Sequence, residues 1–191
     1  LIYKGRTIIR TSRCSCWRIY DALLERYVDK NDPHTLRSLN MLCVRFVFCL
    51  YAEDAGLFGK KSAFHDYMEQ FPAKLWHSQI KELFKILNQE PKERDKYIDE
   101  ELAAFPYVNG GLFSDIDIEI PSFSEELVRL ILDEASLGFN WSEISPTIFG
   151  AVFEATLNPI TRRSGGMHYT SISNIHKVIN PLFLDDLRQE F

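Results

Sequence analysis

Cysteine is scarce in this sequence, and its pattern excludes two common uses of the residue. The four cysteines do not form a disulfide framework in a chain of 191 residues. Cys14 and Cys16 have the wrong spacing for a zinc knuckle, and no second Cys or His pair follows them. Cys43 and Cys49 lie in an apolar run, where we expect them to be small core residues. We therefore expect no metal site.

Long apolar runs are also missing. The longest is about a dozen residues, whereas a transmembrane helix needs roughly 20. No signal peptide is present, so we expect a cytoplasmic protein with no membrane partner. The sequence begins at Leu1 and stops at Phe191 within a helical pattern. We expect it to be part of a longer protein.

Positive charge is in the minority. Lys and Arg number 22 against 27 Asp and Glu, which gives a net charge of -5. Because phosphate neutralisation supplies most non-specific affinity, we expect such a chain to bind nucleic acid poorly by itself. The bases gather in residues 1–18 and in the patch Arg162, Arg163 and Lys177, both free of acids. If DNA is contacted, these are the expected places.

What the sequence has is a hydrophobic core, with 46% apolar residues and 14 Phe. Asp32 followed by Pro33 predicts the start of a long helix that ends near Ala55, with Gly56 just beyond it. The helix is apolar on nearly all sides, and Arg45 is the one charge in its middle. An unpaired buried guanidinium is very costly, so we expect a carboxylate or carbonyl partner from another segment.

Further helices are predicted on either side of a short alternating segment. The alternation of Ile116, Ile118 and Ile120 with acids is typical of a half-buried strand or extended edge. The sequence therefore predicts a mainly α fold, an irregular multi-helix bundle around one buried central helix with at most a short strand or hairpin.

The other helical periods cover about 17–29, 62–71, 73–88, 92–102 and 124–137. Ser62 and Ser124 are candidate N-caps, and Leu75 and Leu137 are expected on packed helix faces. The helix at 92–102 is expected to be charged and solvated on most faces.

A basic glycine loop near the C-terminus is the best candidate for ligand contact. Residues 160–169 contain two arginines and two glycines but no acid, and Thr170 or Ser171 can cap the helix that follows. Unpaired N–H groups at such a helix start suit a carboxylate or phosphate. Arg162 and Arg163 are accordingly candidate DNA-binding residues. An ordinary loop and helix cap is the alternative.

Three segments of the chain carry a family resemblance. They are residues 40–58, the run Tyr-Val-Asn-Gly-Gly-Leu-Phe at 107–113, and residues 162–187. Together they resemble the helical spacer and methyltransferase entrance of single-chain type IIG restriction-modification enzymes. In that family an N-terminal nuclease is joined by a helical spacer to an adenine-specific DNA methyltransferase that uses S-adenosylmethionine.

The resemblance implies roles for the last segment. His168, Tyr169 and Thr170 would lie beside the methionine end of S-adenosylmethionine. Ile172 stands where the family often has an acid, so the acidic contact is not expected here. The implied organisation is an arm of unknown role at 1–16, a helical spacer at 17–158, and a loop and helices at 159–191 that lead into the methyltransferase.

Catalytic motifs are absent. The chain has neither the glycine-rich strand turn for the cofactor nor an Asn-Pro-Pro-Tyr type motif, which holds a flipped adenine. No cluster of acids and lysine suits a nuclease, and no local triad suits a hydrolase. We therefore expect no catalytic residue and no activity from the chain alone, within a parent that methylates adenine in DNA and carries restriction endonuclease activity. The alternative is a self-contained helical protein-interaction module whose acidic surface binds a basic partner.

Overall fold

The structure, a computed structural model, describes residues 18–109 and 111–143. They belong to the first of two units into which the chain divides, residues 1–144. The predicted arm at 1–16, the predicted segment 159–191 and the end of the predicted spacer lie outside the described residues.

The regular structure of the described residues is helical and contains no strand, which confirms the predicted mainly α class. A first helical stretch covers 18–24. The elements after it are α2 (Pro33–Asp54), α3 (Ala63–Glu69), α4 (Ala73–Leu87), the 3₁₀ turn η1 (Pro91–Glu93), α5 (Glu100–Ala103), α6 (Glu125–Arg129), the π-helix η2 (Leu130–Leu137) and the 3₁₀ turn η3 (Trp141–Glu143).

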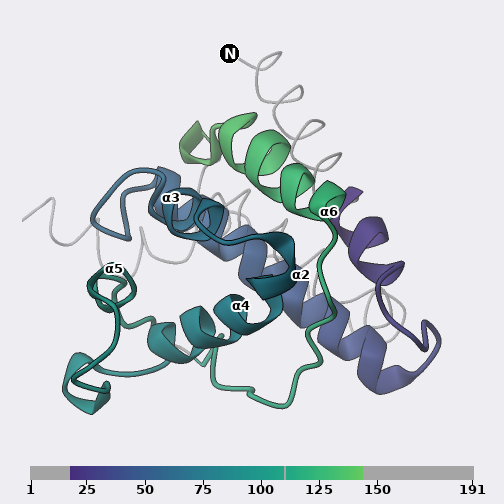
Figure 1. The fold of residues 1–191 in the computed structure, drawn as a ribbon, viewed down its shortest axis with the longest axis horizontal. Helices are drawn as coiled ribbons and strands as arrows, with labels where there is room; N and C mark the ends of the chain where they lie inside the picture. The colour runs from purple at the N-terminus through teal and green to yellow at the C-terminus, as the bar shows by residue number, and fades with distance from the viewer. Residues whose placement is uncertain (1–17, 110, 144–191) are drawn as a thin grey trace, which may run out of the picture. The chain divides into compact units, whose positions relative to one another are not determined.

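The central helix is α2, as predicted. It runs through the middle of this unit, with α6 along one flank and α4 along the other (Figure 1). The Asp32 side chain caps its first turn by accepting from the Thr35 N–H, and Pro33 occupies the first helical position. Ala55 is the C-cap, and Gly56 beyond it has a φ of 72°, a left-handed conformation that suits glycine. The local signals therefore set both ends of α2.

By length and composition, α2 is apolar enough to cross a membrane, with a mean hydropathy of 1.3 in its most apolar window. However, 67% of that window is buried inside the fold. Leu39, Leu42, Phe46 and Leu50 have no exposed surface, and each buried side chain of this kind contributes roughly 2 kcal/mol. The apolar side chains of α2 are thus covered by the protein itself, as in the core helix of a globular unit.

Phe46 is the point where α2 meets its neighbours. Its ring makes edge-to-face contacts with Phe64 of α3, Phe84 of α4 and Phe123 before α6, with centroids 6.2, 6.4 and 6.2 Å away. Cys49, one turn further on, is fully buried, as is expected of a core cysteine. One aromatic side chain thus joins three segments from distant parts of the sequence.

Two finer expectations differ from the structure. Ser62 does precede α3, but it adopts a left-handed conformation with a φ of 57°, and its side chain makes no capping hydrogen bond. Leu75, expected on the packed face of α4, is 40% exposed. Ile86, about three turns further along the same side of α4, is 1% exposed.

The predicted charged helix at 92–102 is wrong. The chain there forms only the short turn η1 and the four-residue α5. Aspartate side chains compete with the helix, because Asp95 accepts from the Tyr97 N–H and Asp99 caps α5. Arg94 then folds the segment back onto the end of α4. Its guanidinium donates to the carbonyls of Ile86, Gln89, Ala103 and Phe105 at 2.8–3.2 Å.

The predicted helix at 124–137 is present, but it changes type. Ser124 caps it as expected by accepting from the Leu127 N–H, and the α-helical part ends at Arg129. The π-helix η2 continues from there. A π-helix has more residues per turn than an α-helix, so the inward face shifts. Leu137, expected in the core, is consequently 62% exposed, and Ser136 is buried.

Gly138 ends η2 at a position with no space for a side chain. A Cβ there would lie 2.5 Å from the Glu134 carbonyl oxygen and 3.1 Å from that of Asp133. Both are backbone atoms, so they cannot rotate away. Glycine is therefore required by close approach here, and not by a positive φ, since its φ is -77°.

We expect Gly138→Ala to lower the free energy of unfolding by about 2 kcal/mol, because the methyl group must displace backbone atoms of η2. Urea denaturation followed by circular dichroism measures the change. The matched control is Leu137→Ala, whose removed atoms are mostly exposed, so it should change stability by less than about 0.5 kcal/mol. Equal stabilities for the two variants would contradict the steric account.

Candidate functional site

An extended segment lies along α2 and is held there by side chains. We call residues 112–123 the strap. The Glu119 N–H donates to Ser38 Oγ of α2 at 3.0 Å, and Thr35 Oγ1 donates to the Glu119 carboxylate at 3.1 Å. Tyr27 Oη donates to the Glu119 carbonyl at 2.6 Å. Later strap residues pair with earlier α2 residues, so the strap runs antiparallel to the helix.

Arg45 anchors the other end of the strap. Its side chain is 2% exposed, and its Nε and Nη2 donate to the carbonyls of Leu112 and Asp115 at 3.0 and 2.7 Å. The guanidinium carbon lies 5.1 Å from the Phe84 ring centroid and 5.4 Å from that of Phe113. Burial lowers the pKa of Arg45 to about 10, so it is still charged at pH 7. The predicted carbonyl partner from another segment is confirmed.

The strap also corrects the strand prediction. Residues 115–124 are neither helix nor turn, and Ile118 and Ile120 are each 7% exposed, as the alternation predicted. The strap forms no strand, however, and Ile116 is 83% exposed. The reason is that the neighbour of the strap is a helix, whose backbone groups are already paired. Side chains of α2 therefore replace the hydrogen bonds of a β-ladder.

A second junction lies at the C-terminal end of α2. The Glu53 carboxylate, 1% exposed, accepts from the His65 N–H of α3 at 3.0 Å and from Ser136 Oγ of η2 at 2.7 Å. The Asp54 carboxylate accepts from the Trp141 N–H of η3 at 2.7 Å. Burial raises the pKa of Glu53, while its hydrogen bonds oppose that rise. Two adjacent acids thus join three elements to α2.

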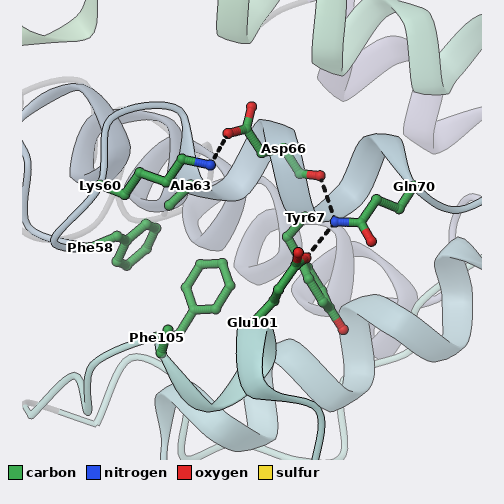
Figure 2. Close-up of a pocket in the computed structure, with 9 residues that line it drawn as sticks. Phe58, Lys60, Ala63, Asp66, Tyr67, Gln70, Glu101 and Phe105 are labelled. Carbon is green, nitrogen blue, oxygen red and sulfur yellow. Dashed lines mark hydrogen bonds and ion pairs between the residues drawn. The ribbon is translucent and has the colours of Figure 1, made fainter.

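The pocket drawn in Figure 2 lies between α3, the loop before it and α5. It has a volume of about 180 Å³. Aromatic rings form much of its wall, with the Phe105 centroid 5.1 Å from that of Phe58 and 5.6 Å from that of Tyr67. Its rim is polar, and Figure 2 shows the rim groups bonded to each other. Lys60 pairs with Asp66, and Gln70 donates to Glu101 and to the Asp66 carbonyl.

Tyr67, which lines this pocket, is not a base near neutral pH. Burial and the nearby Asp99, Glu82 and Glu101 raise the pKa of Tyr67 to about 12, so the phenol is neutral. Its hydroxyl donates to Gln79 Oε1 at 3.0 Å. Among the described residues, no group of three His, Cys, Asp or Glu could hold a metal ion. The pocket is therefore a packing feature between helices with a polar rim.

A second hollow, of about 380 Å³, lies beside the strap and is lined mainly by polar groups. Arg37 pairs there with Asp115 at 2.9 Å, and His34 lies 3.6 Å from the Glu119 carboxylate. The Arg37, His34 and Glu119 side chains are more than half exposed, so these pairs contribute little to stability.

The residues predicted to meet ligands, His168, Tyr169, Thr170, Arg162 and Arg163, lie outside the described residues, and their roles stay predictions. Within the described part, the sequence reasoning missed Glu53 and Arg94. A signal existed for Glu53, because Leu42, Phe46, Cys49 and Glu53 recur at helical spacing on one buried face. No local signal marks Arg94, whose acceptors depend on how the chain folds back.

We expect Arg45→Ala to lower the free energy of unfolding by about 4 kcal/mol, since it leaves two buried carbonyls without donors and opens a cavity. Arg45→Lys should cost about 2 kcal/mol, because an ammonium cannot match the planar fork. Urea denaturation of the purified chain measures both. Arg37→Ala is the control, because its ion pair to Asp115 is exposed and should cost less than about 0.5 kcal/mol. A loss for Arg45→Ala no larger than for this control would contradict the anchoring role.

Stability should also depend on pH through Glu53. A folded-state pKa above the ordinary 4.5 means that the contribution of this group is fully present below pH 4.5 and is lost as pH rises through the raised pKa. Glu53→Gln has no charge to bury, so its stability relative to wild type should increase between pH 4.5 and 7. Urea denaturation across this range measures the difference. The exposed Glu69→Gln is the control, and an equal trend for both variants would contradict the burial argument.

Comparison with known proteins shows what this part of the chain resembles. Residues 37–113, which span most of α2 through the start of the strap, match the family model described as the MmeI helicase spacer domain. The chain is 38% identical over 177 residues to DNA methyltransferase A of Bacillus subtilis strain 168. That alignment covers 91% of this chain and 19% of the relative.

A solved structure gives the same assignment. The chain resembles the type IIL restriction-modification enzyme MmeI in complex with DNA, with a TM-score of 0.66 and 38% identity. The match covers 96% of this chain and 23% of that one, so the chain spans about a fifth of either relative's length. Taken together, these matches support a helical spacer of a restriction-modification enzyme.

Proposed function

We propose that this chain holds a nuclease module and an S-adenosylmethionine-dependent DNA adenine methyltransferase at a fixed separation in a single-chain enzyme of the type IIG kind. The observation that carries the proposal is the clamp of the strap onto α2 by Arg45, with two carbonyl acceptors 67 and 70 residues away in sequence. A spacer can fix a distance only if its elements cannot slide along one another.

Three separate junctions supply that resistance to sliding. Arg45 holds the strap, Glu53 with Asp54 holds α3, η2 and η3, and Arg94 closes the loop between α4 and α5. In each case a charged side chain bonds to the main chain of another segment, so sliding would leave desolvated charge without a partner. The arrangement supports a stiff connector.

We further propose that the C-terminal segment borders the cofactor site of the parent. By the family resemblance, His168, Tyr169 and Thr170 would contact S-adenosylmethionine, which supplies the methyl group. Arg162 and Arg163, in a basic loop without acids, would contact DNA phosphates. The described residues contain no strand followed by a glycine-rich turn, and the catalytic groups are expected in the methyltransferase itself. The proposed role of this segment is to enclose the cofactor.

The interaction-module alternative has less support. It draws on the net charge of -5, which places an acidic surface on the protein. The alignment of 91% of this chain with a protein named DNA methyltransferase A favours the spacer over an unrelated interaction module.

The test uses the full-length protein that contains this chain, with labelled S-adenosylmethionine and mixed-sequence DNA. We expect methyl transfer to adenine and cleavage at a fixed distance from the methylated site. Tyr169→Ala with Thr170→Ala should lower methyl transfer at least tenfold, because the cofactor loses contacts made during transfer. Tyr97→Ala, which removes a tyrosine 95% exposed, is the control and should leave transfer unchanged.

The outcomes separate the parts of the proposal. Unchanged transfer in the double variant would contradict the cofactor role of the segment, and scattered cleavage positions would contradict the fixed separation. A folded wild-type protein that neither binds S-adenosylmethionine nor transfers methyl would favour the interaction module.

A further inference from the structure

The outer surface of α4 carries a row of lysines. The helix buries Trp76, Ile80, Leu83 and Leu87 on one side. Its other side presents Lys74, Ser78, Lys81 and Lys85, all exposed. In Figure 1, α4 is the teal helix on the flank of α2 opposite to α6. We call these three lysines the α4 lysine row.

The spacing of the row makes it straight. The lysines are separated by seven and then four residues, close to two turns and one turn of a 3.6-residue helix, so their directions around the axis agree within roughly 40°. Along the axis they cover roughly 16 Å, at 1.5 Å per residue. One strand of a DNA duplex carries a charge every 3.4 Å or so of axis, so the row is long enough to follow several phosphates.

The charge of the row is available for a partner. Lys74 and Lys81 form no ion pair with another described residue. Lys85 lies 3.7 Å from Glu82 with both side chains more than half exposed, a weak pair that a phosphate can replace. Outside the row, Lys61, Lys96 and Arg129 are also exposed without an ion pair to another described residue, and five other cations are paired with acids. These pairs are Arg18–Glu134, Lys30–Glu25, Arg37–Asp115, Lys60–Asp66 and Lys92–Glu90.

We propose that the α4 lysine row binds the phosphate backbone of duplex DNA. This inference rests on the proposed function, in which the spacer belongs to a DNA-modifying enzyme. The observation behind it is three aligned, exposed and largely unmatched ammonium groups on a chain of net charge -5. Because the rest of the surface is acidic on balance, DNA can approach the described part favourably along this row.

The chemistry of lysine sets what the row does. An ammonium on a flexible stem is a compact point charge that pairs with phosphate and does not read base edges. The row therefore adds affinity without sequence preference. It positions the spacer along the duplex, and the sequence is read elsewhere in the parent.

The test measures how DNA affinity of the full-length protein depends on salt. Each phosphate contact contributes about 0.9 to the slope of log K against log salt concentration. Lys74→Gln with Lys81→Gln should therefore reduce the slope by about 2, to the same extent on specific and non-specific duplexes. Lys74→Arg with Lys81→Arg, which keeps both charges, should retain the wild-type slope.

The matched control is Lys61→Gln with Lys96→Gln, two exposed lysines off the row that also form no ion pair with another described residue. It should leave the slope within about 0.5 of wild type. An unchanged slope in the Lys74 and Lys81 glutamine variant would overturn the proposal, and so would an equal reduction in the control, which would show an effect of net charge. The proposed function is tested separately by methyl transfer of the wild-type protein. An unchanged salt slope together with normal methyl transfer would therefore overturn only the role of the lysine row.

Discussion

The fold depends on the burial of one positive charge. A guanidinium inside an apolar helix has lost its hydration, and only close, well-directed acceptors offset that loss. Arg45 finds two main-chain carbonyls in the strap, while Phe84 and Phe113 pack near its charge. These contacts bring α2, α4 and the strap into one place. The arrangement of the other helices follows from this fixed centre.

The polar side chains of α2 supply both donors and acceptors to the segments around it. Toward the middle, Arg45 donates to carbonyls of the strap. At the C-terminal end, Glu53 and Asp54 accept from N–H groups of α3 and η3. The strap needs donors for its carbonyl groups, because it has no β-ladder. The first turns of α3 and η3 need acceptors for N–H groups that no helical carbonyl pairs. One helix supplies both, which explains how so much non-repetitive chain packs without a sheet.

The sequence predicts what is local and misses what is distant. Asp32 with Pro33 and Ala55 with Gly56 mark the ends of α2 by chemistry within a few residues, so those ends were predictable. The need of Arg45 for a carbonyl was also predictable, because desolvation requires it in any fold. Which carbonyl it finds was not, since the acceptors lie about 70 residues away.

The incorrect prediction of a helix at 92–102 has a related cause. Its charged composition suits a helix, but Arg94 meets carbonyls from α4 and from beyond α5 that no local pattern reveals. The exposure of Leu137 likewise reflects the switch to π-helical geometry. Of the candidate ligand-binding residues, Arg162 and Arg163 were predicted from the basic glycine loop, and His168, Tyr169 and Thr170 from the family resemblance. All five lie outside the described residues.

The direction of the bonds at the strap has a consequence for how such enzymes can diverge. At Leu112 and Asp115, Arg45 recognises main-chain oxygens, which every amino acid provides. Side chains at these two positions can therefore be exchanged between relatives while the anchor is preserved, whereas the arginine itself has no substitute with the same fork. Recombination that replaces the strap but keeps α2 would therefore produce hybrid proteins in which Arg45 still anchors the strap to the helix.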